Sequence, residues 1–122
     1  MSNKKVILRQ VGKFVNVFDE DAVIISYLLN YKLVNDKVGF PMNALNKVIN
    51  TLEEKKISYE VKGEEKIAKD FKNNNKYDSI LRTAKEIVAL RKRYIDIKTY
   101  FDSLTVEQLE KIISYIEEVI NE

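Results

Sequence analysis

Residues 6–18 read Val-Ile-Leu-Arg-Gln-Val-Gly-Lys-Phe-Val-Asn-Val-Phe, and this stretch decides how the first half of the chain folds. Two runs rich in β-branched and aromatic residues, 6–11 and 14–18, stand on either side of Gly12-Lys13. Runs of this kind around a two-residue pair that contains glycine are typical of a β-hairpin. We therefore predict two antiparallel strands joined by a tight turn at Gly12-Lys13.

The second of these strands presents two different faces. Side chains alternate along a strand, so Phe14, Asn16 and Phe18 share one face while Val15 and Val17 share the other. If the valines face the core, both phenylalanines point outward, and such an apolar pair on a free surface indicates a binding contact. Alternatively, helices from the second half cover this face. The large apolar surface of those helices favours the covered arrangement.

The rest of the first half alternates helices and strands. Asp19-Glu20-Asp21 favours a helix start, because acidic residues complement the helix dipole, and the helix continues to Leu29. We then predict a strand over 31–34, a turn at Asn35-Asp36 and a returning strand ended by Pro41. A second helix follows an N-cap at Asn43, and residues 57–61 alternate as a half-buried strand that Gly63 ends. The predicted order over residues 1–63 is ββαββαβ, an α+β domain.

The second half is predicted to be helical, because all three glycines and the single proline fall within the first 63 residues. Residues 64–75 are interpreted as a connector, with one amphipathic turn near Ile67 and a flexible point in the Asn73–Asn75 tract. A long helix is predicted over 76–101. Thr105 and Gln108 then fit a capping box for a last helix, so residues 76–122 form a predicted helical hairpin.

Composition excludes several classes of protein. The chain has 122 residues, enough for one core, with 45% apolar and 33% charged residues, which is typical of a globular domain. It contains neither cysteine nor histidine, which excludes disulfides and removes the commonest general base. No run of 18 apolar residues is present, so we expect no membrane association and a cytoplasmic protein.

Signals of catalysis are weak in this sequence. Asp19-Glu20-Asp21 and Glu64-Glu65 are adjacent carboxylates, which point in different directions along the chain and lack further metal ligands. The three glycines lie too far apart for a phosphate-binding loop. We therefore predict no catalytic residue, no metal, no cofactor and no enzymatic activity.

Charge is distributed unevenly in the second half. Residues 66–104 hold ten basic and five acidic side chains, whereas residues 105–122 hold one basic and five acidic. The predicted phosphate contacts on the long helix are Arg82, Lys85, Lys92 and Arg93. The alternative is a solvated face, because acidic residues such as Asp78 and Glu86 lie four positions from Arg82. Tyr77, Tyr94, Tyr100 and Tyr115 are interpreted as core or interface residues rather than as base-stacking groups.

The last helix carries a wide apolar stripe, which includes Leu109, Ile113, Ile116 and Ile120. The long helix is too narrow to cover all of it. We therefore expect a homo-oligomer, as a symmetric four-helix bundle, or a protein partner bound through the C-terminal helices.

Residues 9–18, followed by Asp21-Ala22, resemble the N-terminal mismatch-recognition domain of the DNA repair protein MutS. That family shows a Gly-Asp-Phe-Tyr-Glu-hydrophobic-Phe signature and then an Asp-Ala helix start. The segments Val38-Gly39-Phe40-Pro41, Ala44-Leu45 and Tyr59-Glu60-Val61 are also similar to that domain, so the resemblance covers about residues 6–62. It implies a MutS-like mixed sheet with two helices.

The resemblance also implies a way to contact DNA. The family's phenylalanine wedges beside a mismatched base, and a glutamate two residues later hydrogen-bonds that base. Phe14 matches the phenylalanine, Asn16 stands in place of the glutamate and Lys13 in place of the aspartate. Asn16 can still donate to and accept from a base edge, with Arg9 or Lys13 near a phosphate.

These observations support a small non-enzymatic protein that contacts DNA through a MutS-like module without the ATPase. The alternative is a protein-interaction or dimerisation module that reuses the fold and binds no nucleic acid.

Overall fold

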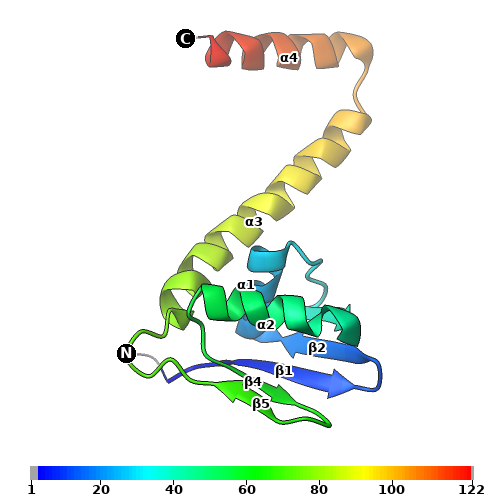
Figure 1. The fold of residues 1–122 in the computed structure, drawn as a ribbon. Coiled ribbons are helices and arrows are strands. Elements are labelled where there is room, and N and C mark those ends of the chain that lie inside the picture. The colour runs from blue at the N-terminus through cyan, green and yellow to red at the C-terminus, as the bar shows by residue number, and fades with distance from the viewer. Residues whose placement is uncertain (1–2, 122) are drawn as a thin grey trace. The chain divides into compact units, whose positions relative to one another are not determined.

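The structure is a computed structural model that describes residues 3–121 (Figure 1). Residues 1–88 and 89–122 form two compact units. The first unit holds a five-stranded mixed sheet with helices, and the second holds helical segments alone. The α+β class that the sequence predicted, with a mixed sheet and a long helical part at the C-terminal end, is confirmed.

The predicted hairpin forms the middle of the sheet. Strands β1 (Val6–Val11) and β2 (Phe14–Phe18) pair antiparallel, with Arg9 opposite Asn16 and Val11 opposite Phe14. Gly12 has φ of 62°, a left-handed conformation that glycine adopts without the steric cost of a side chain. A positive φ at the first position of a two-residue turn matches the right-handed twist of the flanking strands.

Three further strands complete the sheet in the order β3-β2-β1-β4-β5. Strand β3 (Lys37–Pro41) is antiparallel to β2, β4 (Tyr59–Lys62) is parallel to β1, and β5 (Ile67–Lys69) is antiparallel to β4. A parallel neighbour requires a crossover connection, which here contains α1 (Asp19–Leu29), the 3-10 turn η1 (Met42–Ala44) and α2 (Leu45–Glu54).

The core lies between this sheet and its helices, which cover one face (Figure 1). Alternate strand residues point into it and are fully or almost fully buried, as is the face of α2 with Val48 and Leu52. The buried strand residues are Val6, Leu8, Val15, Val17, Val38, Phe40, Tyr59 and Val61. Because side chains alternate, the residues between them lie on the opposite face of the sheet.

Two details of the predicted first half are wrong. Residues 31–34 do not form a strand: Val34 alone makes a bridge, to Lys37, around a turn in which Asn35 and Asp36 both have positive φ. The hydroxyl of Ser26 donates a 2.7 Å hydrogen bond to the Tyr31 carbonyl. In a strand, this carbonyl would instead accept a hydrogen bond from the backbone of a neighbouring strand. Asn43 does not cap a helix either, since it lies inside η1, and α2 begins at Leu45.

Part of the predicted connector belongs to the sheet. Ile67 and Ala68 lie in β5, opposite Val61 and Glu60, so the predicted amphipathic turn is wrong. Asn75, predicted as a flexible point, is an anchor instead. Its Oδ1 accepts hydrogen bonds from the amides of Ser58 and Tyr77 at 3.1 and 3.2 Å, and its Nδ2 donates to the Lys4 carbonyl at 2.7 Å.

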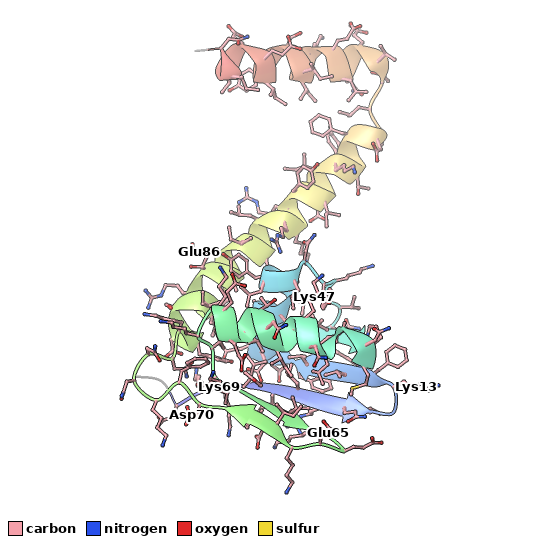
Figure 2. All side chains as sticks on the ribbon, viewed as in Figure 1. Lys13, Lys47, Glu65, Lys69, Asp70 and Glu86 are labelled. Atoms are coloured by element: carbon pink, nitrogen blue, oxygen red, sulfur yellow. The ribbon has the colours of Figure 1, made fainter. Side chains whose placement is uncertain are left out.

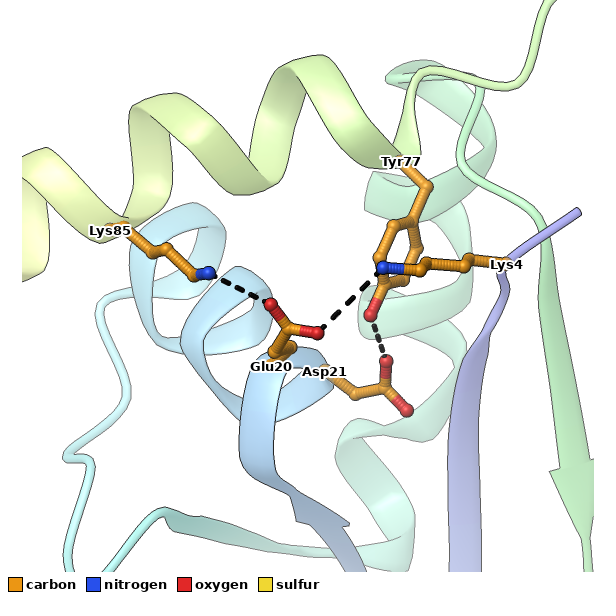
Figure 3. Close-up of polar contacts among 5 residues, drawn as sticks. All are labelled: Lys4, Glu20, Asp21, Tyr77 and Lys85. Carbon is orange, nitrogen blue, oxygen red and sulfur yellow. Dashed lines mark hydrogen bonds and ion pairs between the residues drawn. The ribbon is translucent and has the colours of Figure 1, made fainter. Parts of the chain in front are cut away.

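The long helix α3 (Tyr77–Asp102) begins within the first unit. Tyr77, Leu81 and Ala84 are buried there, which confirms Tyr77 as a core residue. The Tyr77 hydroxyl donates a 2.5 Å hydrogen bond to Asp21 Oδ1 (Figure 3). The other oxygen of this carboxylate, Asp21 Oδ2, accepts from the Ile7 amide at 3.1 Å. The start of α3 is therefore fixed to both α1 and β1.

The second unit contains the rest of α3 and the last helix, α4 (Val106–Ile120). The predicted capping box is confirmed: the Gln108 amide donates to Thr105 Oγ1 at 3.2 Å, and the Thr105 amide donates to Gln108 Oε1 at 3.0 Å. No residue of α4 that the structure describes is buried. Within residues 3–121, no helix is long and apolar enough to cross a membrane.

Candidate nucleic-acid interface

The face of the sheet opposite the helices carries an aromatic and basic surface, which we call the open face. We define it by Arg9, Val11, Phe14, Asn16, Phe18, Lys37 and Lys62, all of them exposed except the half-buried Asn16. They come from β1, β2, β3 and β4, and each alternates with a buried core residue. The pairing of the strands, rather than their nearness in sequence, brings them onto one surface.

Phe14 lies on this face next to the hairpin turn. Its side chain is 58% exposed, and it sits opposite Val11 on β1 and Pro41 on β3. The covered arrangement, which the sequence favoured, would have buried this side chain. Phe18, four residues along the same strand, is 42% exposed, and Lys37 Nζ lies 5.9 Å from the centre of its ring.

The side chain of Asn16 has room because a glycine stands beside it. Asn16 pairs with Gly39 on β3, and a Cβ atom at Gly39 would lie only 3.2 Å from Asn16 Oδ1. The amide group therefore lies over the glycine backbone. An amide in this position can offer both a donor and an acceptor, which a carboxylate cannot do.

Basic residues surround these side chains. Arg9 lies between Asn16 and Lys62 in one row across β2, β1 and β4, and Lys13 stands at the tip of the hairpin (Figure 2). Glu60 is an acidic neighbour of this row, and it pairs with Lys5 at 3.6 Å. The surface is thus predominantly positive, which suits a polyanion.

A hollow of about 240 Å³ adjoins the open face at the junction of β2 and α1. Its lining combines apolar, basic and acidic residues: Ile7, Arg9, Phe18, Asp19, Glu20, Asp21 and Tyr77. Burial raises the pKa of Asp21, while the hydrogen bonds from Tyr77 and Ile7 oppose that rise. Both Asp21 oxygens already accept these bonds, so the carboxyl group serves the fold.

The basic residues predicted on α3 are divided between the two units. Arg82 and Lys85 lie in the first unit, whereas Lys92 and Arg93 lie in the second. Lys85 Nζ makes an ion pair with Glu20 Oε2 at 2.8 Å, and this ion pair lowers the pKa of Glu20 (Figure 3). The Lys85 ammonium therefore already has an anionic partner within the protein.

Sequence reasoning identified only part of the open face. It found Arg9, Lys13, Phe14 and Asn16, which the structure brings together on one hairpin. It missed Lys37, Gly39 and Lys62, because their places depend on which strands are neighbours. The residue alternation in 37–41 and 59–62 contained a signal for their face, but not for their proximity to Arg9 and Asn16.

Residues 3–121 contain no group of three or more Asp or Glu side chains arranged to hold a metal ion.

Comparison with known proteins identifies the family. A search of curated proteins found no match. The family model described as MutS domain I matches residues 1–88 of the 122, which are also the residues of the first compact unit. The match extends beyond the segment 6–62 that carried the resemblance, and it includes β5 and the start of α3. The chain therefore belongs to the MutS domain I family.

Proposed function

We propose that this chain contacts DNA through the open face of its sheet and acts as a nucleic-acid-associated protein without catalytic activity of its own. Domain I is a DNA-contacting, non-catalytic recognition module in MutS, and the present chain belongs to that family. The observation that carries the proposal is the exposed Phe14 beside the Gly12-Lys13 turn, at the position of the family's wedging phenylalanine. We infer a cytoplasmic location.

Each residue of the open face has a role in this proposal. Phe14 inserts as an apolar wedge between bases, as apolar side chains do in proteins that bend DNA. Asn16, beside it, offers its amide to a base edge. Arg9 and Lys13, with Lys62 in the same basic surface, neutralise phosphates. Arg82, Lys85, Lys92 and Arg93 extend the phosphate contacts along α3, with Lys85 exchanging its partner Glu20 for a phosphate.

A titration at two salt concentrations tests the proposal. The full chain is titrated against duplex, single-stranded and mismatched DNA, and its affinity should fall steeply as salt rises, because bound phosphates release counterions. Arg9→Gln and Lys62→Gln should each reduce the slope of log K against log salt by about one. The matched control is Lys47→Gln, which lies on α2 in the helix layer (Figure 2). Equal effects of all three substitutions, or no DNA binding at low salt, would contradict the proposal.

A second candidate function rests on α4. Its apolar stripe is exposed in the structure, with Val106, Ile113, Ile116, Val119 and Ile120 all on the surface. This favours a protein-interaction module, with the C-terminal helices holding another chain. Binding to protein alone, with no salt-dependent binding of DNA, would support this function over the first.

A further inference from the structure

The two helical segments of the second unit carry matching heptad patterns. On α3, Leu90, Tyr94, Ile97 and Phe101 follow one another at intervals of four, three and four residues. On α4 the intervals alternate in the same way, through Val106, Leu109, Ile113, Ile116 and Ile120. Apolar residues at these intervals occupy positions a and d of a coiled-coil seam. None of them is buried in the chain by itself.

One antiparallel register fits both patterns at once. It places residues at heptad position a of one helix against residues at position d of the other. The resulting layers are Leu90–Ile120, Tyr94–Ile116, Ile97–Ile113 and Phe101–Leu109. From each layer to the next, the residue number rises on α3 by the same amount as it falls on α4, as an antiparallel pair requires. Four successive layers therefore form without a gap or a mismatch.

The same register pairs opposite charges at the e positions. Arg91 and Lys98 each follow a d residue on α3, and Glu110 and Glu117 each follow a d residue on α4. Arg91 and Lys98 are seven residues apart, and so are Glu110 and Glu117. The antiparallel register therefore places Lys98 against Glu110 and Arg91 against Glu117. Charges beside the seam determine which helices pair. Two α4 helices packed against each other would instead place glutamate against glutamate.

The other flank of the seam is largely apolar. Tyr100, Ile112 and Val119 occupy g positions, and Tyr100 and Val119 are exposed. Arg93 occupies the remaining g position of α3 within the four layers, beside Val119 at the end of the seam. A pair made of one α3 and one α4 would leave this flank in water. Helices that are apolar at a, d and g are typical of bundles, where a third and a fourth helix cover the extra position.

We propose that two copies of this chain associate through residues 89–120 as a symmetric four-helix bundle. Each α3 pairs antiparallel with an α4 through the four layers above, with Lys98 against Glu110 on the outside. The flank of Tyr100, Ile112 and Val119 packs against the same flank of the second copy. This arrangement specifies the partner in the proposed role of the C-terminal helices, and it does not depend on DNA contact by the first unit.

Sedimentation of the full chain tests the proposal. The wild-type protein should be a dimer, and Ile112→Glu should raise the dissociation constant of the dimer by at least about 100-fold, because it buries a carboxylate opposite Tyr100 with no basic partner in each copy. The matched control is Ser114→Glu, which adds the same charge to α4 at position b, outside the seam, and should leave the dimer intact. A monomeric wild-type protein at high micromolar concentration, or equal effects of the two substitutions, would overturn it.

A charge exchange tests the register independently. Lys98→Glu should raise the dissociation constant about tenfold, because it places glutamate against Glu110 in both pairs of helices. Adding Glu110→Lys to it restores opposite charges and should restore the wild-type constant. Failure of the double variant to recover would exclude this register. Circular dichroism should show unchanged helix content in each variant, and Phe14→Ala should remain dimeric, which separates this test from that of DNA binding.

Discussion

Phe14 is the residue at which the two candidate functions lead to opposite expectations. Its ring stands 58% exposed on the open face, so it makes little contribution to the core. An exposed aromatic side chain has few packing contacts to lose on truncation. Truncating Phe14 should therefore have little effect on folding, and the wedge role assigns its side chain a function in DNA binding.

We expect Phe14→Ala to abolish DNA binding while changing the free energy of unfolding by no more than about 0.5 kcal/mol, as is usual for surface substitutions. A thermal melt and a binding titration on the same sample measure both quantities. Tyr115→Ala, an equally exposed aromatic residue on α4, should change neither. A large fall in melting temperature for Phe14→Ala would show that the ring is covered in solution and would remove the wedge.

Tyr77 and Asp21 show a different use of polar side chains, in which both serve the attachment of α3. Burial and the hydrogen bond to Asp21 raise the pKa of Tyr77 far above its ordinary value, so the hydroxyl stays a donor at all physiological pH values. We expect Tyr77→Phe to lower the free energy of unfolding by about 1–2 kcal/mol, because one oxygen of Asp21 loses its donor. Urea denaturation measures this, with Tyr115→Phe as the exposed control. Equal stability of the two variants would show that this hydrogen bond does not hold α3.

At the level of secondary-structure elements, the start of α3 is part of the sheet domain. Tyr77, Leu81 and Ala84 fill the core, and the Lys85–Glu20 ion pair joins α3 to α1 on the surface. This explains why the match to MutS domain I continues to residue 88, well past the last strand. The same helix then continues beyond Val88 with a different apolar stripe, which packs only in the proposed dimer.

Glu20 gives the Lys85 ion pair a measurable pH dependence. The hydrogen bond and charge of Lys85 lower the pKa of Glu20 below its ordinary value, so the ionised form stabilises the fold. This contribution is present above the pKa of the unfolded chain and is lost as pH falls through the lower folded value. We expect Lys85→Gln to melt below the wild type at pH 7 and together with it in acid, once the pH is below the folded-state pKa of Glu20. A gap that persists in acid would assign another role to Lys85.

How much of the fold was predictable differs from element to element for physical reasons. The hairpin could be predicted because the glycine indicates its turn and the β-branched runs indicate its strands. The capping box of α4 was readable because both of its side chains are local. Strand β5 was not, because three residues carry no period and its place depends on pairing with β4. Residues 31–34 had a strand-like composition, but the Ser26 hydroxyl occupies the Tyr31 carbonyl.

The candidate site shows the same limit. Alternation along one strand predicted that Phe14 and Asn16 share a face, and this is confirmed by their places in β2. The contributions of Lys62 and Gly39 required the strand order, since β4 reaches β1 only through a crossover of more than forty residues. Non-local pairing of this kind leaves no signal in a short window of sequence.

At the scale of the whole molecule, the two proposals place the wedge and the dimer contact on different units, with Lys92 and Arg93 of the second unit adding phosphate contacts. The first unit carries the open face, and the second carries the heptad seam. A dimer joined through residues 89–120 would present two DNA-contacting sheets on one particle. Two weak contacts on the same duplex add to each other, because the second forms at high effective concentration once the first has formed.

The contributions of the two units to DNA binding can therefore be distinguished by varying the length of the duplex. We expect the wild-type protein to bind a long duplex at least about tenfold more tightly than one that holds a single copy, since linked sites gain avidity whenever both can engage. Ile112→Glu should keep the affinity for the short duplex and lose the extra affinity for the long one, because its open face is intact and its partner is gone. Phe14→Ala should lose binding to both duplexes while it remains a dimer. Titration of each variant against both duplexes at one salt concentration measures this. If Ile112→Glu weakened binding to the short duplex as strongly as to the long one, α4 would have to contact DNA directly, and its role as a dimer contact alone would be wrong.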